Sequence, residues 1–430
     1  MRKASKNPIV IVPGMMGSIG GDMLPRIGEW RFGVAKWIYE PLIKGLQDIG
    51  YREKDNLFIC FYDWRQKTSE SSRLYLEPLM SMVKTKFPNK KIDLICHSMG
   101  GLVGRHYLQK EGNRGIVENF IMMGTPNKGA IDAYYFWTTG SLMKKDKKTF
   151  YNMTYKGYIW LISKLLGIPL GINRLEDLHR CFKGMEDLLP SEDFGFVLCY
   201  RENNQELRLL PRKYMKYHNL MLDALNKEKS KLAMNVDEVY SVVGIETVTN
   251  DLLILNKDKL LQGGIEEIIG SGTTLEGDGT VTKKSATLEG YNNVEIKGTH
   301  YSIVKSTLGV IYKLYGVEVA DVVEIKENSL HILLSTHLDF SIKKDGKTIL
   351  SYINGRLQAE YELMYEVFQQ EFLWVAIRHI PIGSYDVEVF NITKQNLHFL
   401  LMTEGVDEEL EELKGEVEKS KYYKIDFNIN

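Results

Sequence analysis

The stretch Ile95–Gly101 constrains the fold of this 430-residue chain more than any other part. A short apolar run before it indicates a buried strand, and Leu102–Leu108 after it indicates a helix. A serine on a sharp turn from strand to helix is typical of a nucleophile elbow, whose strained and closely packed backbone needs small neighbours. Gly100 meets that need, whereas Cys96 stands where the usual pattern has glycine. If Ser98 is a nucleophile, a base, an acid and an oxyanion hole must lie elsewhere in the chain.

Short apolar runs alternate with helical patterns over much of the chain. Most of the runs are continuous, as expected for strands that helices cover on both faces. Helical patterns over 66–87, 98–111 and 302–315 separate them. The alternation predicts an α/β fold with a mainly parallel sheet. The predicted strands are 8–12, 56–62, 91–96, 118–123, 239–245 and 294–297.

The composition excludes some classes of protein. Hydrophobic residues make up 44% of the chain, enough for a full core and too many for a disordered chain. The formal net charge of −1 gives no reason to expect nucleic acid as a partner. Because 430 residues exceed the usual size of one domain, we expect two domains or one domain with a large insertion.

The N-terminus and the cysteines favour a cytoplasmic protein, either free or peripheral at a membrane. Met1–Pro8 leads at once into a short apolar run, without the longer apolar region and cleavage site of a secretory signal. No run of about 18 apolar residues predicts a membrane-spanning helix. The four cysteines lack paired short spacing, which favours reduced core thiols over disulfides. The histidines lack ligand spacing with nearby carboxylates, so we expect no metal site and no cofactor.

Between residues 131 and 235 the alternation of strands and helices stops. The segment is rich in aromatic residues and lysines, and we interpret it as a cap inserted over the carboxyl edge of the sheet. Its part Tyr158–Ile172 is apolar on most faces, which fits equally a helix in the core of the cap and a lid surface that faces lipid. We therefore predict a catalytic domain over 1–317 that carries this insertion.

After about residue 318 the sequence changes to alternating, β-rich runs. Asp345–Gly346 is typical of a tight hairpin turn, and an acidic helix is predicted over 407–414. We interpret residues 318–430 as a separate accessory domain of β-sandwich type. Its predicted strands are 330–336, 338–343, 373–380, 385–390, 397–402 and 422–427.

Two later loops supply candidates for the acid and the base. A serine hydroxyl reacts at neutral pH when an imidazole takes its proton and a carboxylate orients that imidazole. Asp278 lies in a glycine-flanked loop after the strand 239–245, and His300 follows the short strand 294–297. Each has a structural alternative, Asp278 as a turn aspartate and His300 as a residue at a helix start. The order Ser98, Asp278, His300 matches that of the α/β-hydrolase topology and favours a catalytic triad.

An oxyanion hole needs two backbone N–H groups that point at the developing negative charge. One should come from Met99, which follows the nucleophile at the start of the predicted helix. The other should come from Met15, in the glycine-bracketed loop after the strand 8–12. His97 projects in a different direction from its neighbour Ser98, so we expect it to be packed or to line the substrate site.

Together these segments resemble the lecithin:cholesterol acyltransferase family, a branch of the α/β hydrolases that includes group XV-type phospholipases. The resemblance covers about residues 8–315, and Tyr62–Arg65 is its most specific piece. It implies the triad and the oxyanion donors named above, and attack on an acyl ester with transfer to water or another alcohol. The other segments that carry it are Ile11–Ser18, Cys96–Gly101, Gly124–Ala130, Leu188–Ser191, Gly277–Val281 and Thr299–Tyr301.

The resemblance has limits and adds one structural expectation. The secreted members carry a signal peptide and a disulfide soon after the oxyanion segment, whereas residues 19–55 contain no cysteine. We therefore do not carry over a lipoprotein or lysosomal role, or cholesterol as acceptor. In the family, the segment at Tyr62–Arg65 helps to fix the active-site scaffold, and we expect Asp63 and Arg65 to form a structural ion pair.

The leading hypothesis is a serine esterase of the phospholipase A or lipid acyltransferase type, working through an acyl-enzyme. The aromatic, lysine-bearing cap suits a long acyl chain and an anionic interface, so we expect a lipid substrate and peripheral membrane contact through the cap. One alternative is a thioesterase, deacylase or cyclising acyltransferase on a non-lipid substrate, because fold and triad do not set the substrate. Another is a non-catalytic binding protein, against which the complete triad order argues. No motif assigns a partner to the C-terminal domain.

Overall fold

The computed structural model describes residues 7–21, 23, 28–141, 175–203, 205–261, 267–317, 329–368, 371–378, 380–381, 383–391, 397–404, 412–417 and 422–429. Among them, residues 7–23 and 29–317 form one compact unit, and those from 329 onward form another. We call these the first unit and the second unit.

Six parallel strands form the central sheet of the first unit, in the order β10-β7-β4-β3-β1-β2. They are β1 (Ile9–Val12), β2 (Leu57–Ile59), β3 (Ile92–His97), β4 (Val117–Met123), β7 (Val236–Ile245) and β10 (Asn292–Lys297). Each lies at a predicted position. All four residues of β1 and all six of β3 are buried, as expected for strands covered on both faces.

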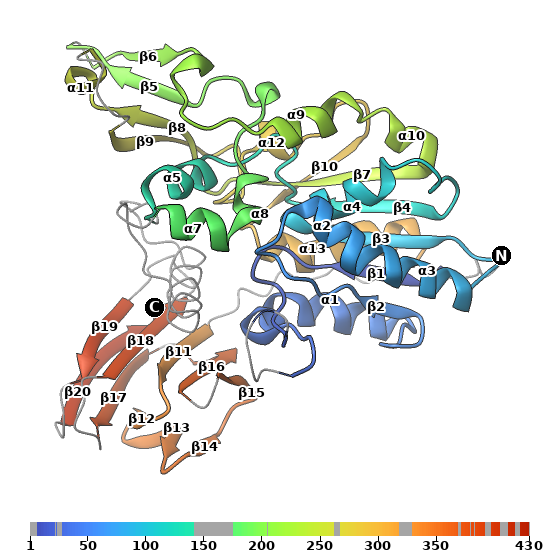
Figure 1. The fold of residues 1–430 in the computed structure, drawn as a ribbon. Coiled ribbons are helices and arrows are strands. Elements are labelled where there is room, and N and C mark those ends of the chain that lie inside the picture. Colours follow the sequence, from blue (N-terminus) through green and yellow to red (C-terminus); the bar gives the residue numbers. More distant parts are fainter. Residues whose placement is uncertain are drawn as a thin grey trace. The chain divides into compact units, whose positions relative to one another are not determined.

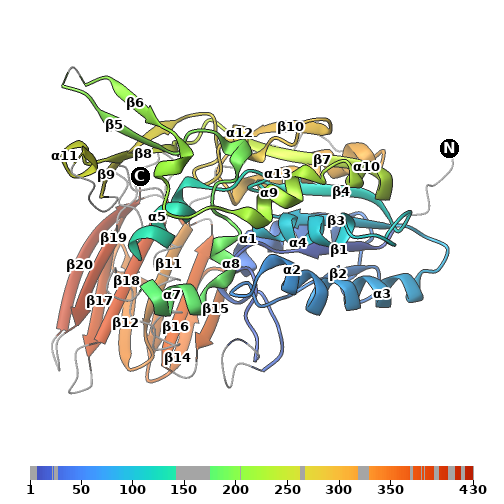
Figure 2. The ribbon, with the colours of Figure 1, turned by 45° about the horizontal axis from the view of Figure 1, so that its top comes forward.

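Helices cover both faces of this sheet (Figure 1). On one face, α1 (Lys36–Asp48) and α13 (Ser302–Leu314) share an apolar core with β1 and β4, which includes Leu42, Ile311, Ile11 and Ile121. On the other face, α4 (Met99–Leu108) lies so close to the sheet that a Cβ on Gly104 would meet Phe120. Figure 2 shows α2, α3 and α4 together in this second layer.

The predicted helix over 66–87 consists of three helical segments. They are α2 (Thr68–Ser71), a π-helical turn η2 (Ser72–Leu76) and α3 (Glu77–Lys86). Pro78 has no N–H to donate to the carbonyl of Leu74, which explains why the helical hydrogen bonding changes at this point.

A small second sheet of the first unit has the order β6-β5-β8-β9. β5 (Leu198–Arg201) and β6 (Leu207–Leu210) fall within 131–235, but β8 (Thr249–Leu255) and β9 (Ile268–Thr274) follow β7. The sheet therefore joins two segments that β7 separates in the chain. The apolar pattern did not predict this pairing, because Gly270 and Gly272 interrupt β9.

Shorter elements complete the first unit. They are η1 (Gly33–Ala35), α5 (Ile131–Thr139), α7 (Leu175–Cys181), α8 (Lys183–Glu186), η4 (Glu192–Phe194), η5 (Arg212–Tyr214), α9 (Leu220–Lys227), α10 (Lys231–Asn235), α11 (Lys257–Leu261) and α12 (Lys283–Ala286). The apolar segment Tyr158–Ile172 lies outside the described residues.

The second unit consists of two antiparallel sheets, in the orders β15-β16-β11-β18-β19 and β14-β13-β12-β17-β20. Leu330 and Val375 of the first sheet share one apolar core with Phe340 and Val387 of the second, which is sandwich packing. The strands are β11 (Ser329–Ser335), β12 (Leu338–Lys344), β13 (Lys347–Ile353), β14 (Arg356–Ala359), β15 (Leu363–Phe368), β16 (Phe372–Arg378), β17 (Gly383–Asn391), β18 (Leu397–Glu404), β19 (Glu412–Val417) and β20 (Tyr422–Ile429).

In the second unit, the hairpin turn predicted at Asp345–Gly346 is confirmed. The helix predicted over 407–414 is wrong from Glu412 onward, where the structure describes the chain. Asp345 and Gly346 have φ of 50° and 76°, as in a type I′ hairpin turn between β12 and β13. The acidic helix predicted over 407–414 conflicts with β19, which begins at Glu412, and residues 407–411 lie outside the described residues. Pairing of β19 with β18 outweighs the intrinsic helical preference of this glutamate- and leucine-rich segment.

The architecture confirms the predicted fold class, an α/β-hydrolase fold followed by a β-sandwich-like part. All four cysteines are free thiols, and Cys60, Cys96 and Cys199 are buried. In the described part of the chain, no helix has the length and apolar character needed to cross a membrane.

Candidate active site

Ser98 lies on the turn between β3 and α4, at the carboxyl end of its strand. Its φ of 53° and ψ of −126° place it in a strained region for an L-residue, as the elbow interpretation requires. A Cβ on Gly100 would lie 2.5 Å from the carbonyl oxygens of Val12 and Pro13, so only glycine fits there. Ser98 itself is only partly buried.

Cys96 replaces the usual glycine of the elbow, and α4 accommodates it. The thiol is fully buried, and burial raises the pKa of Cys96 well above its usual value of 9.0. A Cβ on Gly104 would come within 3.0 Å of its sulfur atom. Gly104 therefore provides the space on α4 for the sulfur atom, and Cys96 is an inert packing residue.

Asp278 and His300 form a buried pair on two loops. Nδ1 of His300 donates to Oδ2 of Asp278 over 2.7 Å, because a carboxylate oxygen only accepts. The backbone N–H groups of Thr280 and Val281 donate to Oδ1 over 2.9 and 2.7 Å. The N–H of His300 also donates to the carbonyl of Asp278 over 2.7 Å. The carboxylate is thus oriented by the backbone and in turn orients the imidazole.

The loop of Asp278 lies at the end of β7, although β8 and β9 separate the two in the sequence. The N–H of Glu246 donates to Leu275 over 2.8 Å, and that of Thr247 donates to Gly277 over 3.0 Å. Glu276, two residues away from Asp278, is exposed and pairs with Lys283 instead. Asp278 is therefore the carboxylate of this loop that reaches the histidine.

The end of β4 brings Ser98 close to this pair. The N–H of Ser98 donates to the carbonyl of Met123 over 2.8 Å. At the next residue, a Cβ on Gly124 would lie 2.9 Å from Oδ2 of Asp278 and 3.0 Å from Nδ1 of His300. Asp278 and His300 therefore lie against Gly124, and Ser98 is hydrogen-bonded to the residue before it, so all three lie at the carboxyl edge of the parallel sheet.

Met15 lies in a tight turn beside the serine. The N–H of Gly17 donates to the carbonyl of Gly14 over 3.0 Å, and Met16 has a φ of 60°. A Cβ on Gly14 would lie 2.9 Å from Cβ of Ser98. Met99 is buried at the first position of α4, where backbone N–H groups have no intrahelical acceptor. Both candidate oxyanion donors are therefore adjacent to the serine in space or in sequence.

The segment Tyr62–Arg65 holds the Met15 turn from both sides. The hydroxyl of Tyr62 donates to the carbonyl of Pro13 over 3.0 Å, and the indole N–H of Trp64 donates to that of Ser18, also over 3.0 Å. The expected ion pair between Arg65 and Asp63 is present, with a closest N–O distance of 2.7 Å. The two hydrogen bonds fix the backbone of the Met15 turn at both of its ends.

The structure adds Tyr39 to this cluster, and His97, which was expected to be packed or to line the substrate site, is buried within it. Tyr39 of α1 contacts both Gly14 and His97, and His97 contacts His300. Tyr39 belongs to no recognisable motif and precedes His97 by 58 residues, so only the tertiary structure could reveal it.

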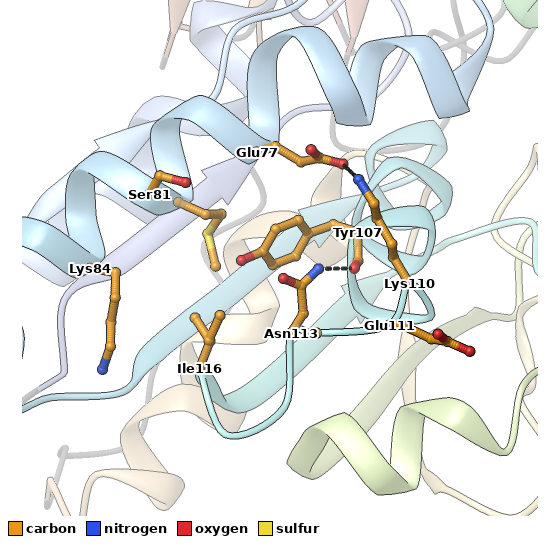
Figure 3. A pocket seen from close by; sticks show the side chains of 10 residues that line it. Glu77, Ser81, Lys84, Tyr107, Lys110, Glu111, Asn113 and Ile116 are labelled. Atoms are coloured by element: carbon orange, nitrogen blue, oxygen red, sulfur yellow. Dashed lines mark hydrogen bonds and ion pairs between the residues drawn. The ribbon is translucent and has the colours of Figure 1, made fainter.

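A pocket of about 480 Å³ lies away from this cluster, between α3 and the segment after α4 (Figure 3). Lys110 pairs with Glu77 across it, and Lys84 donates to the backbone carbonyls of Pro88 and Lys90. Asn113 donates to the carbonyl of Tyr107. Because these polar groups are satisfied within the protein, they do not define a ligand site. Among the described residues, no group of three His, Cys, Asp or Glu side chains is arranged to hold a metal ion.

Comparison with protein families gives one match. The model of the lecithin:cholesterol acyltransferase family matches residues 31–165, which confirms the resemblance seen in the sequence. The matched region contains Tyr62–Arg65 and Ser98, but not Met15, Asp278 or His300. A search of curated proteins found no match.

Solved structures with a similar fold include lipases and phospholipases. The propeptide form of the Bacillus licheniformis lipase BlEst2 is 13% identical, with 96% of each chain covered and a TM-score of 0.40. The lin2722 gene product of Listeria innocua is 14% identical, with 74% of this chain and 96% of that chain covered and a TM-score of 0.33. Phospholipase PlaB of Legionella pneumophila is 9% identical, with 97% of this chain and 92% of that chain covered and a TM-score of 0.32.

Proposed function

Starting from the match of residues 31–165 to the lecithin:cholesterol acyltransferase family, we propose that this chain is a serine esterase that acts on lipid acyl esters. It cleaves them as a phospholipase A, or transfers the acyl group to another alcohol. The observation that carries the proposal is the buried hydrogen bond of 2.7 Å between His300 and Asp278, next to the elbow of Ser98. The order and the positions of these three residues support a triad.

The chemistry follows from the roles of the three side chains. His300 holds its Nδ1 proton toward Asp278, so Nε2 is the nitrogen that takes the proton of the Ser98 hydroxyl. The serine oxygen attacks the ester carbonyl carbon, and the N–H groups of Met15 and Met99 stabilise the resulting oxyanion. The imidazolium then protonates the departing alcohol, which leaves an acyl-enzyme on Ser98. Water or a second alcohol, deprotonated by Nε2 of His300, then attacks the acyl carbon. The bond to the Ser98 oxygen breaks, and the imidazolium returns its proton to that oxygen, which restores the free serine.

We further propose that residues 1–317 form the catalytic domain, with a cap over 131–235, and that 318–430 form an accessory domain. The division is supported by the described residues from 29 to 317, which fall in one compact unit, and by those from 329 onward, which fall in the other. The cap provides the contact with a lipid surface. A lipid substrate is supported by the family match rather than by the triad, because a triad does not select its substrate.

The nucleophile is tested with Ser98→Ala. We expect kcat on a p-nitrophenyl ester to fall by at least about 10⁴-fold, and labelling by a fluorophosphonate to disappear. Ser81→Ala is the matched control, since Ser81 is an exposed serine of α3. Unchanged turnover in Ser98→Ala would remove the serine mechanism, and a wild-type chain that neither labels nor turns over would favour a binding protein.

The substrate class is tested with phospholipid vesicles and mass spectrometry of the products. Release of fatty acid, or its transfer to an added alcohol, is the expected result. Activity restricted to soluble thioesters or short esters would contradict the lipid assignment while leaving the serine mechanism intact.

A further inference from the structure

A chain of hydrogen bonds joins the Met15 turn to the backbone of His300. It passes through Tyr39 and His97, both of which are buried. The hydroxyl oxygen of Tyr39 lies 2.7 Å from the nitrogen of Gly14 and 2.8 Å from Nδ1 of His97. Nε2 of His97 lies 2.8 Å from the carbonyl oxygen of His300. This series of hydrogen bonds therefore begins at Gly14, one residue before the proposed oxyanion donor, and ends at the backbone carbonyl of His300, the proposed base.

The direction of each bond follows from the chemistry of the groups. A carbonyl oxygen only accepts, so Nε2 of His97 carries a proton and donates it to His300. Burial, followed by the proximity of His300, lowers the pKa of His97 well below its usual value of 6.5. The ring is therefore neutral, and its Nδ1 is an acceptor. The hydroxyl of Tyr39 must donate to Nδ1, while its oxygen accepts the N–H of Gly14.

A neutral His97 is also compatible with the proposed reaction. Its ring centroid lies 4.8 Å from that of His300. During turnover His300 becomes positively charged, and a second cation at this distance would oppose that charge. The neutral ring holds the base without repelling its protonated form.

We propose that Tyr39 and His97 are positioning residues. They hold the Met15 turn and His300 at fixed positions relative to each other, on either side of Ser98. Neither touches the reacting atoms. Their effect is geometric, because an oxyanion donor and a base are effective only when both are correctly placed around the same tetrahedral centre. The inference rests on the proposed serine mechanism.

The test measures kcat on a p-nitrophenyl ester per active site, with sites counted by fluorophosphonate titration. Tyr39→Phe removes the central hydroxyl and keeps the ring that stacks on Phe32. We expect kcat per site to fall by up to about 100-fold, because a small misplacement of reacting groups has effects of this size. KM and the fraction of titratable sites should change little. Tyr312→Phe is the matched control, since the Tyr312 hydroxyl donates to the Gly45 carbonyl between α1 and α13, and its kcat should stay unchanged.

Two substitutions of His97 test separately its hydrogen bond to Tyr39 and its hydrogen bond to His300. His97→Asn places an acceptor oxygen near the Nδ1 position and keeps the bond to Tyr39, whereas His97→Gln places a donor nitrogen near the Nε2 position and keeps the bond to His300. Each should lower kcat per site. The double variant Tyr39→Phe/His97→Asn should have a kcat per site no lower than that of the worse single variant. The reason is that one broken hydrogen bond already disconnects the Met15 turn from His300.

Two outcomes overturn the inference. One is an unchanged kcat per site in Tyr39→Phe, and the other is a double variant whose loss equals the product of the two single losses. If Ser98→Ala is inactive while Tyr39→Phe is fully active, only the positioning role is lost. Activity in Ser98→Ala would instead remove the proposed function itself.

Discussion

The two units of the chain bury polar side chains in different ways. In the first unit, Ser98, Asp278 and His300 converge at one edge of the parallel sheet, and the last two are almost fully buried. In the described part of the second unit, the buried polar side chains include His331, Ser351 and Asn391, which lie on three different strands of two sheets, β11, β13 and β17.

Strand direction explains this difference. Parallel strands all end at the same edge, so the loops after β3, β4, β7 and β10 meet there. Antiparallel strands end alternately at opposite edges, so their loops do not accumulate on one side. In this protein the direction of the strands therefore decides where loop side chains can gather at one edge of a sheet.

The largest effect should come from Asp278, the proposed acid. Asp278→Asn leaves the shape intact but favours the wrong tautomer of His300, and kcat should fall by about 10⁴-fold. Steady-state kinetics measure this, with thermal unfolding as the check on folding. Glu276→Gln is the matched control in the same loop and should keep full activity, because Glu276 pairs with Lys283. Loss of activity in Glu276→Gln with full activity in Asp278→Asn would instead assign the role of the acid to Glu276.

A second pair of variants compares the cores of the two units. Phe340→Ala and Phe120→Ala each delete a buried ring, of the second and the first unit respectively. Each should lower the free energy of unfolding of its own unit by about 3–5 kcal/mol. Hydrogen exchange read peptide by peptide localises the loss, and kcat per titrated site should fall only in Phe120→Ala. Equal loss of protection in both units would show that they unfold together.

The pH dependence of stability should differ between the units. Burial lowers the pKa of His106 to about 4 and that of His331 to about 3. Below pH 6.5 the unfolded chain binds protons that the folded chain does not, so stability falls as the pH falls. The slope approaches about 1.4 kcal/mol per pH unit for each histidine. The fall due to His106 ends near pH 4, and that due to His331 continues to about pH 3.

This pH dependence is measured by hydrogen exchange corrected for intrinsic rates. His106→Leu should reduce the slope of the first unit alone, to which buried His97, whose pKa is also lowered, still contributes. His331→Leu should reduce the slope of the second unit alone. A slope that neither variant changes would contradict the assignment to His106 and His331.

The smallest expected effect concerns backbone strain. In the first unit Ser98 combines a φ of 53° with a ψ of −126°, whereas in the hairpin turn of the second unit the positive φ values of 50° and 76° belong to Asp345 and Gly346, residue types that tolerate them. Ser98→Gly should therefore be more stable than Ser98→Ala by about 1 kcal/mol, although neither variant should be active. Chemical denaturation compares the two variants. A less stable glycine variant would mean that the elbow is not strained.

Much of the fold could be predicted because its signals are local. The six parallel strands are short apolar runs at the expected positions, and Asp345–Gly346 forms the expected turn. The strand β8 could not be predicted, since its pairing with β5 depends on a distant segment. The predicted helix over 407–414 was wrong at Glu412, because pairing with β18 outweighs the intrinsic helical propensity of this segment.

The sequence by itself determined the candidate residues of the site. The elbow at Ser98 and the glycine-flanked Asp278 are recognisable because tight turns restrict which residues fit locally. The tertiary structure alone decided that Asp278, and not Glu276, reaches His300, and that Tyr39 and His97 link the Met15 turn to His300. The physical reason is that a turn depends on its own few residues, whereas a hydrogen bond between loops depends on where the whole sheet places their ends.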